Sequence, residues 1–150
     1  KGVEANVVND YEKALQMARV QETPLLIDIT GWACQNCGRM EEGVWTKPDV
    51  KEYITNNFIL VSLYVDDRDK LPVEERITYT TREGQKKSLK DIGDKWATFQ
   101  AENFNQVTQP LYVVLDNKER LASHPVGYTP DWREYLAWLK CSKEAFDKNK

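Results

Sequence analysis

The feature that most constrains the fold is an apolar run, LLIDIT (25–30), placed shortly before two cysteines in the motif CQNC (34–37). Apart from Asp28, the run is apolar on both faces of the pleat, which is typical of a strand buried on both sides. A second such run, FILVSLYVDD (58–67), comes after a helical pattern. Because a strand–helix–strand crossover joins parallel strands, the two runs predict the centre of an α/β sheet.

Helical patterns surround these two strands in the sequence. Asn9 followed by Glu12 marks the start of the first helix. The last helix has apolar residues at i, i+3, i+4 and i+7. The predicted helical segments are 9–21, 38–45, 49–57, 91–104 and a final one that includes Trp132, Tyr135, Leu136 and Leu139.

Two hairpins complete the predicted elements. The first joins RITYT (76–80) to QKKSLK (85–90) inside an insertion that spans 67–104. The second joins LYVVLD (111–116) to RLASH (120–124) near the C-terminus. This order of elements predicts a single α/β domain, 1–150, with a central mixed sheet that helices flank on both faces.

Composition narrows the classes of function. The chain has 150 residues, of which 41% are hydrophobic, which is enough for one ordinary buried core. Its net charge of −3, with interspersed charges, gives no basic stripe for nucleic acid. No apolar run is long enough for direct membrane insertion by this segment. Three cysteines are also too few for a scaffold held by disulfides.

The cysteine pair is predicted to lie where β-strand and helix meet, at the edge where open α/β sheets form their sites. At the first turn of a helix, free N–H groups and the helix dipole should lower the pKa of Cys34 below about 8.5. Cys37, one turn later, is placed to resolve a mixed disulfide. Since Gln35 and Asn36 carry no charge or ring, we expect a moderate redox potential.

Two acidic residues are candidate partners of the dithiol. Asp28 lies on the strand that leads into the site; if it is buried, its pKa is raised and it can exchange a proton with Cys37 through a water molecule. Alternatively, it is a carboxylate at a strand end that faces solvent. Glu41 falls one helical turn after Cys37 and either tunes this thiol or is an ordinary solvated glutamate.

Other uses of the cysteines fit the sequence less well. A zinc site needs more ligands than CQNC supplies, and the only histidine, His124, lies in a predicted turn. A purely structural disulfide closes so short a loop that it removes little entropy from the unfolded chain. Cys141 falls away from the apolar face of the last helix and is predicted to be unpaired and non-catalytic. A reactive dithiol is therefore favoured over a metal-binding or structural role.

LLIDIT, CQNC at a helix start and QP before LYVVLD together resemble the thioredoxin superfamily. GWACQNCGRMEEGVW with FILVSLYVDD resembles the C-terminal thioredoxin-like domain of DsbD-type thiol:disulfide interchange proteins, in particular Bacteroidetes-like versions. The resemblance implies a thioredoxin-like three-layer fold and a periplasmic domain of an inner-membrane protein. Such a domain takes electrons from the membrane portion of its parent and passes them to periplasmic thiol proteins, as in cytochrome c biogenesis. It needs no metal or cofactor beyond its disulfide.

The resemblance also assigns roles by position. Cys34 is the nucleophile, Cys37 the resolving thiol, Asp28 the buried carboxylate and Glu41 the acidic residue after the motif. The predicted substrate-binding residues are Trp32, Gln35, Asn36, Gln109 and Pro110, the last as a cis-proline whose preceding residue presents its backbone to a partner.

Two departures stand out from the family's usual pattern. Ala33, not tryptophan, precedes Cys34, so Trp32 either covers the site or has an ordinary packing role. Gln109 replaces the usual threonine before the proline. The alternative function is a binding module of the same fold with an inert or metal-loaded dithiol.

Overall fold

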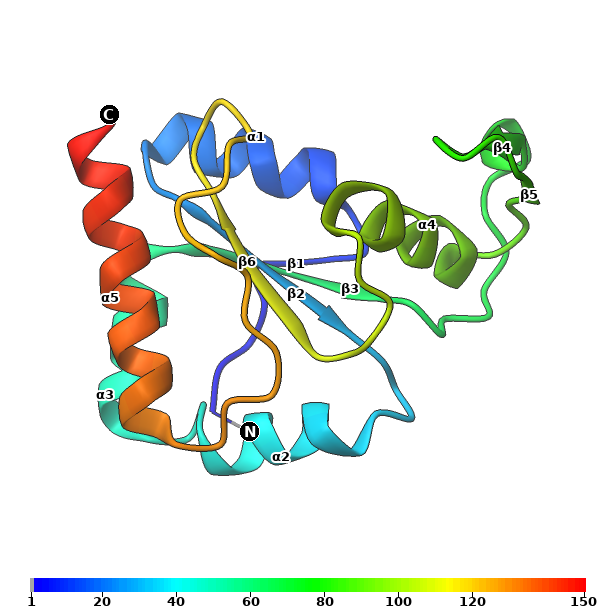
Figure 1. Cartoon of the computed structure of the whole chain (residues 1–150). Helices are drawn as coiled ribbons and strands as arrows, with labels where there is room; N and C mark the ends of the chain where they lie inside the picture. The colour runs from blue at the N-terminus through cyan, green and yellow to red at the C-terminus, as the bar shows by residue number, and fades with distance from the viewer. Residues whose placement is uncertain (1) are drawn as a thin grey trace.

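The computed structural model describes residues 2–150 and confirms an α/β fold with a central mixed sheet (Figure 1). The strands lie in the order β1-β3-β2-β6. β1 and β2 are parallel to β3, whereas β6 is antiparallel to β2. Their bounds are Val7–Val8 for β1, Leu25–Thr30 for β2, Ile59–Tyr64 for β3 and Leu111–Leu115 for β6.

Helices cover both faces of this sheet and make three layers (Figure 1). One core cluster joins the sheet to α1 (Tyr11–Gln21) and α4 (Ile92–Phe104). The other joins it to α2 (Gln35–Gly43), α3 (Pro48–Asn57) and α5 (Trp132–Lys148). No helix within residues 2–150 is both long enough and apolar enough to cross a membrane.

The alternation of β2 decides which face each side chain occupies. Ile27 and Ile29 pack in the cluster with α1 and α4, and Leu26 packs in the cluster with α2. Because successive side chains of a strand point to opposite faces, Asp28 shares the face of Leu26. The carboxyl group therefore lies on the same side of the sheet as the helix that carries the cysteines.

The N-terminal segment differs from the prediction in two ways. The first helix begins at Tyr11 rather than near 9, because the side chain of Asp10 caps it by accepting a hydrogen bond from the N–H of Lys13 at 3.1 Å. Asn9 adopts a positive φ of 57° and bonds to the C-terminal end of β3, where its side-chain oxygen accepts from the N–H of Tyr64 at 2.9 Å. Ahead of it, β1 is too short for the sequence pattern to reveal.

The second predicted hairpin is only partly present. A turn follows β6 as expected, but 120–124 is not a strand; two isolated bridges, Leu115 to Leu121 and Tyr112 to Val126, replace it. Between these bridges the outer segment uses more residues than β6 does, so it bulges out of register. The bulge contains Pro125, which has no N–H for a ladder.

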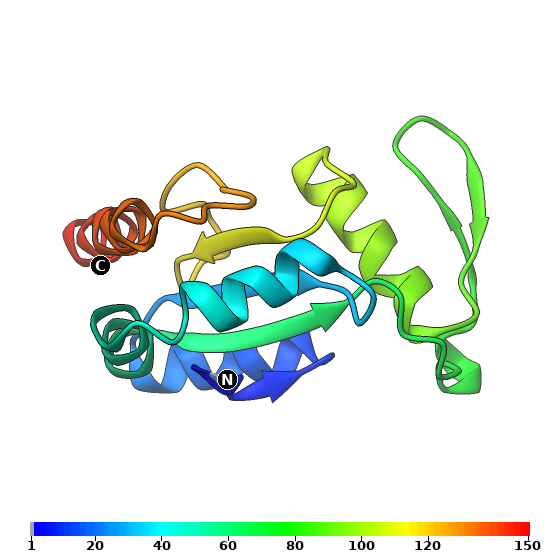
Figure 2. The same ribbon diagram turned by 90° about the horizontal axis from the view of Figure 1, so that it is seen from below.

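The segment 67–104 has two parts. Its second part, α4, belongs to the core, since Trp96 is buried in the cluster with α1. Its first part holds a short 3-10 helix, η1 (Val73–Glu75), and the predicted hairpin of β4 (Thr78–Thr80) and β5 (Lys86–Ser88). Figure 2 shows this hairpin standing off the body of the molecule, on the outer side of α4.

Candidate active site

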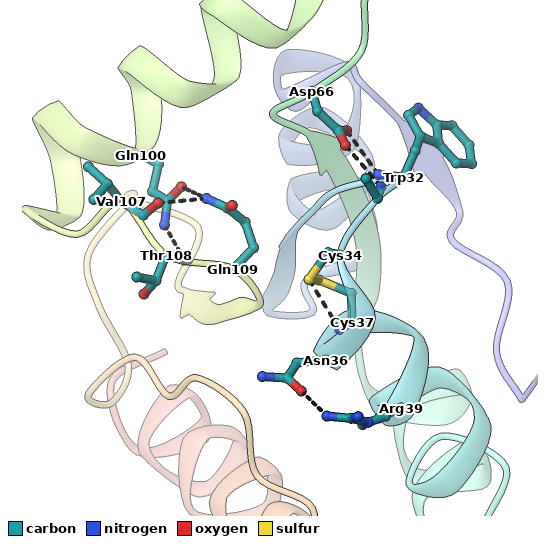
Figure 3. The surroundings of a disulfide bond; sticks show 11 residues. Trp32, Cys34, Asn36, Cys37, Arg39, Asp66, Gln100, Val107, Thr108 and Gln109 are labelled. Atoms are coloured by element: carbon teal, nitrogen blue, oxygen red, sulfur yellow. Dashed lines mark hydrogen bonds between the residues drawn. A yellow bond between two sulfur atoms is a disulfide. The ribbon is translucent and has the colours of Figure 1, made fainter.

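The cysteines form a disulfide at the beginning of α2, as Figure 3 shows. Cys34 is the N-cap residue of this helix, with extended backbone angles, and its Cα lies 5.3 Å from that of Cys37. The N–H of Cys37 points at Sγ of Cys34 at a distance of 3.2 Å. Cys34 is half-buried and Cys37 is buried, so the first cysteine is the more accessible to a partner.

This arrangement suits an asymmetric dithiol. In the reduced state, the N–H that meets Sγ and the positive end of the helix dipole stabilise a thiolate on Cys34. Cys37 lies inside the core, where a charge costs more free energy. The geometry therefore leaves Sγ of Cys34 as the accessible sulfur at the helix start and Sγ of Cys37 as the protected one.

Asp28 is buried, with 3% of its surface exposed, which excludes a carboxylate that faces solvent. In the parallel register it lies opposite Ser62 of β3, whose Oγ donates a hydrogen bond to Oδ2 of Asp28 at 2.9 Å. Burial raises the pKa of Asp28 to about 7; the charge of Glu41 raises it further, and the bond from Ser62 opposes the rise. Asp28 is thus able to gain or lose a proton near neutral pH.

Glu41 is half-buried on α2 and acts on Asp28 through its charge. It lines a pocket of about 340 Å³ together with Ser62, Tyr64 and Trp32. The other wall of this pocket comes from the N-terminal segment that leads into β1. Ser62, whose hydroxyl bonds to Asp28, lines this pocket. Only the side chain of Ser62 therefore separates the buried carboxyl group from the pocket.

Trp32 does not lie over the sulfurs. Its indole is 66% exposed and stacks on Tyr64, with ring centroids 3.8 Å apart and planes 14° from parallel. In Figure 3 it points away from the disulfide. The N–H groups of Trp32 and Ala33 donate to the two carboxylate oxygens of Asp66, at 2.9 and 3.0 Å. Trp32 therefore packs on Tyr64 and does not cover the sulfurs, and its role in substrate binding stays a prediction. Asp66 holds the turn ahead of Cys34.

The predicted residues after the first cysteine lie on the surface of α2. Gln35 is exposed, and Asn36 is half-buried. The side-chain oxygen of Asn36 accepts a hydrogen bond from Nη1 of Arg39 at 2.8 Å. One end of the Asn36 amide is thus already occupied within the helix.

The Gln109–Pro110 peptide bond is cis, as the resemblance implies. Figure 3 places this segment across from the disulfide, on the far side from Trp32. The side chain of Gln109 bonds to Oε1 of Gln100 and to the carbonyl oxygen of Val107. This side chain is therefore bonded to α4 and to its own loop rather than extended toward a partner.

Cys141 and His124, the remaining cysteine and the histidine, are distant in sequence from the CQNC motif. Cys141 is a free, exposed thiol on α5, and His124 is exposed in the segment after β6. Within the part of the chain that the structure describes, no group of three or more His, Cys, Asp or Glu side chains is placed to hold a metal ion.

Sequence reasoning missed four residues of the site: Ser62, Tyr64, Asp66 and Gln100. Ser62 had a signal, because it is the polar residue inside the apolar run of β3 and pairs with Asp28 once the two strands are in register. Asp66 also had a signal in the sequence, since it is one of the two acidic residues that end the apolar run 58–67. Gln100 had none, because a glutamine in a helix is ordinarily solvent-exposed.

Comparison with known proteins concerns the fold. No curated protein sequence shows significant similarity to the chain. Among solved structures, a protein described as the DsbH oxidoreductase matches with a TM-score of 0.65 at 14% identity, covering 96% of this chain and 86% of that one. A thioredoxin from Thermus thermophilus matches with a TM-score of 0.62 at 17% identity, covering 93% of this chain and 86% of that one.

The C-terminal domain of DsbD from Neisseria meningitidis, in its reduced form, is also similar. Its TM-score is 0.56 at 12% identity, covering 89% of this chain and 96% of that domain. Likeness at such identities concerns the fold. A family model described as "Thioredoxin-like" matches residues 6–117, which include all of the sheet and both cysteines. With its sheet order, its disulfide at the start of α2 and this match over well more than half of its length, the chain belongs to the thioredoxin-like family.

Proposed function

We propose that the chain is a thiol:disulfide oxidoreductase that transfers two electrons between its Cys34–Cys37 pair and a disulfide of a partner protein. The observation that carries the proposal is the position of the disulfide: an accessible sulfur at the first turn of α2 and a buried one behind it. Membership of the thioredoxin-like family supports it, as does the likeness of the fold to a protein described as an oxidoreductase.

The reductive half of the reaction begins with the thiolate of Cys34. It attacks one sulfur of the partner's disulfide, forms a mixed disulfide and expels the partner's other sulfur as a thiolate, which takes a proton. Cys37 then gives its proton to Asp28 through a water molecule and attacks Sγ of Cys34. As the Cys34–Cys37 disulfide forms, the mixed disulfide between Cys34 and the partner breaks, and the partner's sulfur leaves as a thiolate that takes a proton from solvent. The partner therefore leaves with two thiols. The dithiol is oxidised by two electrons and the partner's disulfide is reduced by two.

The pKa of Asp28 suits this role. A proton acceptor works best when its pKa lies near the working pH, and burial brings that of Asp28 to about 7. Glu41 supports the same role from α2, because its charge favours the protonated form of Asp28. No metal or cofactor takes part in the proposed reaction.

We further propose that the chain works as a reductant, which gives electrons to the partner's disulfide. It would be the C-terminal periplasmic domain of a DsbD-like protein, reduced by the membrane domain of that protein and oxidised by periplasmic thiol proteins. The motif GWACQNCGRMEEGVW and the following strand support this assignment, and the fold likeness to the DsbD domain is compatible with it.

The exchange reaction is tested by substitution of each cysteine. Cys34→Ser should abolish reduction of a protein disulfide, whereas Cys37→Ser should accumulate a mixed disulfide with it on a non-reducing gel. Cys141→Ser serves as the control and should behave like the wild type. Brief alkylation of the reduced protein at mildly acidic pH should label Cys34 well before Cys141; equal labelling of the two would count against an activated thiol.

The direction of electron flow is tested by the reduction potential. Equilibration of the Cys34–Cys37 couple with a glutathione buffer gives this value. A result near that of thioredoxin, about −270 mV, supports a reductant, and a result near that of DsbA, about −120 mV, contradicts it. A disulfide that no thioredoxin-like donor reduces, or zinc that stays bound in a one-to-one ratio through dialysis, would instead indicate a binding module.

A further inference from the structure

Two glutamine side chains form a connected pair beside the disulfide (Figure 3). Gln100 lies on α4 and is only 1% exposed. Its Nε2 donates to the carbonyl oxygen of Thr108 at 2.8 Å, and its Oε1 accepts from Nε2 of Gln109 at 2.8 Å. The Nε2 of Gln109 also donates to the carbonyl oxygen of Val107 at 3.0 Å. The two amides thus join α4 to three successive residues of the loop before β6.

The two glutamines lie close to the disulfide because of how β2 and β6 pair. β2 and β6 are antiparallel with Ile29 opposite Leu111, so the end of β2 and the beginning of β6 meet at one edge of the sheet. Cys34 follows the first of these strands and Gln109 precedes the second. Whatever fixes the backbone at Gln109 therefore fixes the surface that borders the sulfurs.

The pair is built like a positioning device. A buried amide that lacks hydrogen bonds costs free energy, so Gln100 holds its place only while both ends of its side chain are bonded. One end bonds to the main chain of Thr108 and the other to the side chain of Gln109. The loop on its own has no such support, because Val107 and Thr108 are exposed and lie outside any helix or strand.

The bonds of Gln109 leave its main chain for another use. Its side chain is already bonded within the loop, and its N–H and C=O form no backbone–backbone hydrogen bond within residues 2–150. An extended segment of a partner protein bonds through main-chain groups of this kind. The side chain at 109 is therefore a support and not a contact that selects the partner.

We infer that Gln100 and Gln109 are positioning residues that hold the main chain of Gln109 ready to pair with an extended segment of a partner around its disulfide. The inference rests on the proposed exchange function and deepens it. A protein disulfide, which brings main chain on both sides of the sulfurs, depends on the pair. A small disulfide without a peptide backbone does not use it.

Two single-atom changes test the inference. Gln100→Glu keeps the oxygen that accepts from Gln109 but sets a carboxylate oxygen against the carbonyl of Thr108. Gln109→Glu loses the donor to both of its acceptors; since Gln109 is only partly buried, this variant should fold even if the first does not. Gln106→Glu makes the same change at an exposed position of the same loop and is the matched control.

The measurement compares two substrates with the pre-reduced protein. One is insulin, a protein disulfide, and the other is 5,5′-dithiobis(2-nitrobenzoate), a small disulfide. For Gln100→Glu and Gln109→Glu, we expect the ratio of the insulin rate constant to the small-disulfide rate constant to fall about tenfold, the effect of losing one such hydrogen bond. For Gln106→Glu the ratio should equal that of the wild type.

A pH series separates positioning from general damage. A protonated glutamic acid at 100 carries one O–H donor and one carbonyl acceptor, so it can make both bonds of the native amide. Lowering the pH from about 8 to about 5 should therefore bring the ratio for Gln100→Glu back toward the wild-type value measured at the same pH. No such recovery is expected for Gln106→Glu, which starts at that value.

The outcomes distinguish this inference from the function on which it rests. If the wild type reduces both disulfides and the two variants keep the wild-type ratio, the pair does not position the partner. The inference also fails if both rate constants fall together without recovery at low pH, because this indicates damage to the dithiol. If the wild type reduces neither disulfide, the proposed function fails, and the inference fails with it.

Discussion

At the scale of single residues, the least usual group in the molecule is the buried carboxyl of Asp28. Its pKa is raised from 3.8 to about 7 because burial disfavours the charged form. Between these two pH values the folded protein holds a proton that the unfolded chain has already released. The free energy of unfolding therefore falls as the pH rises through this range and levels off above about 7.

Asp28→Asn should remove this dependence. The asparagine keeps an oxygen that can accept the hydrogen bond from Ser62 but has no proton to lose. In urea unfolding of the oxidised protein, we expect the variant to be more stable than the wild type by about 3 to 4 kcal/mol at about pH 8, and similar to it at about pH 4. Asp69→Asn, at an exposed position, controls for loss of a charge. An equal gain at both pH values would contradict a titration of Asp28 in this range.

The residues of the site differ in how readily the sequence reveals them. Cys34, Cys37 and Asp28 were predictable because their spacing and their apolar surroundings lie within one short stretch of chain. Ser62, although it is polar within an apolar run, and Gln100 were missed, because what makes each of them part of the site is a neighbour from another element. A hydroxyl becomes the partner of Asp28 only through strand register, and the buried amide only through the fold of the loop onto α4.

At the scale of elements, the turn between β2 and α2 sets the position of Cys34. Asp66, which follows β3, accepts hydrogen bonds from both N–H groups of Trp32 and Ala33. A carboxylate is a strong acceptor for such groups. The carboxylate of Asp66 also lies close to Gly31. A Cβ atom at position 31 would lie 3.2 Å from a carboxylate oxygen of Asp66.

Asp66→Ala should loosen this turn without unfolding the sheet. Since the bonds are charge-assisted but near solvent, we expect a loss of about 1 kcal/mol in the free energy of unfolding. The amide hydrogens of Trp32 and Ala33 should exchange with solvent faster in NMR experiments. Asp69→Ala removes a charge three positions later and should change neither measurement. Unchanged amide exchange in Asp66→Ala would show that the turn is held by other contacts.

Most elements were predictable because periodicity carries over long segments. The helices at 91–104 and from Trp132 onward, the two buried strands and the hairpin of β4 and β5 all lie where the patterns indicate them. β1 was missed because two residues show no alternation, and 120–124 was wrong because the pattern does not reveal a bulge at Pro125. Short pairings at the edges depend on the rest of the sheet.

At the scale of the whole molecule, the two core clusters account for the layers and the hairpin stands outside them. β4 and β5 bury little surface; the hairpin contacts α4 through Glu102, which accepts from the hydroxyl of Tyr79 at 3.3 Å and from the N–H of Arg82 at 2.8 Å. Before and after the hairpin, Leu71 and Leu89 are buried. The fold should therefore need the flanking segments and not the hairpin itself.

Replacing Thr78–Ser88 with Asn-Gly tests this division. The N–H of Leu89 donates to the carbonyl oxygen of Ile77 at 2.9 Å, so these residues face each other across the hairpin and a two-residue turn can join them. We expect one cooperative unfolding transition, with a free energy of unfolding within about 1 kcal/mol of the wild type, since the replaced residues bond to α4 through Glu102 and otherwise mainly to one another. Glu102→Gln in the full chain weakens the same contacts and should have an effect of similar size. If the shortened protein unfolds without a cooperative transition, the prediction is wrong. The hairpin of β4 and β5 is then part of the unit that folds cooperatively.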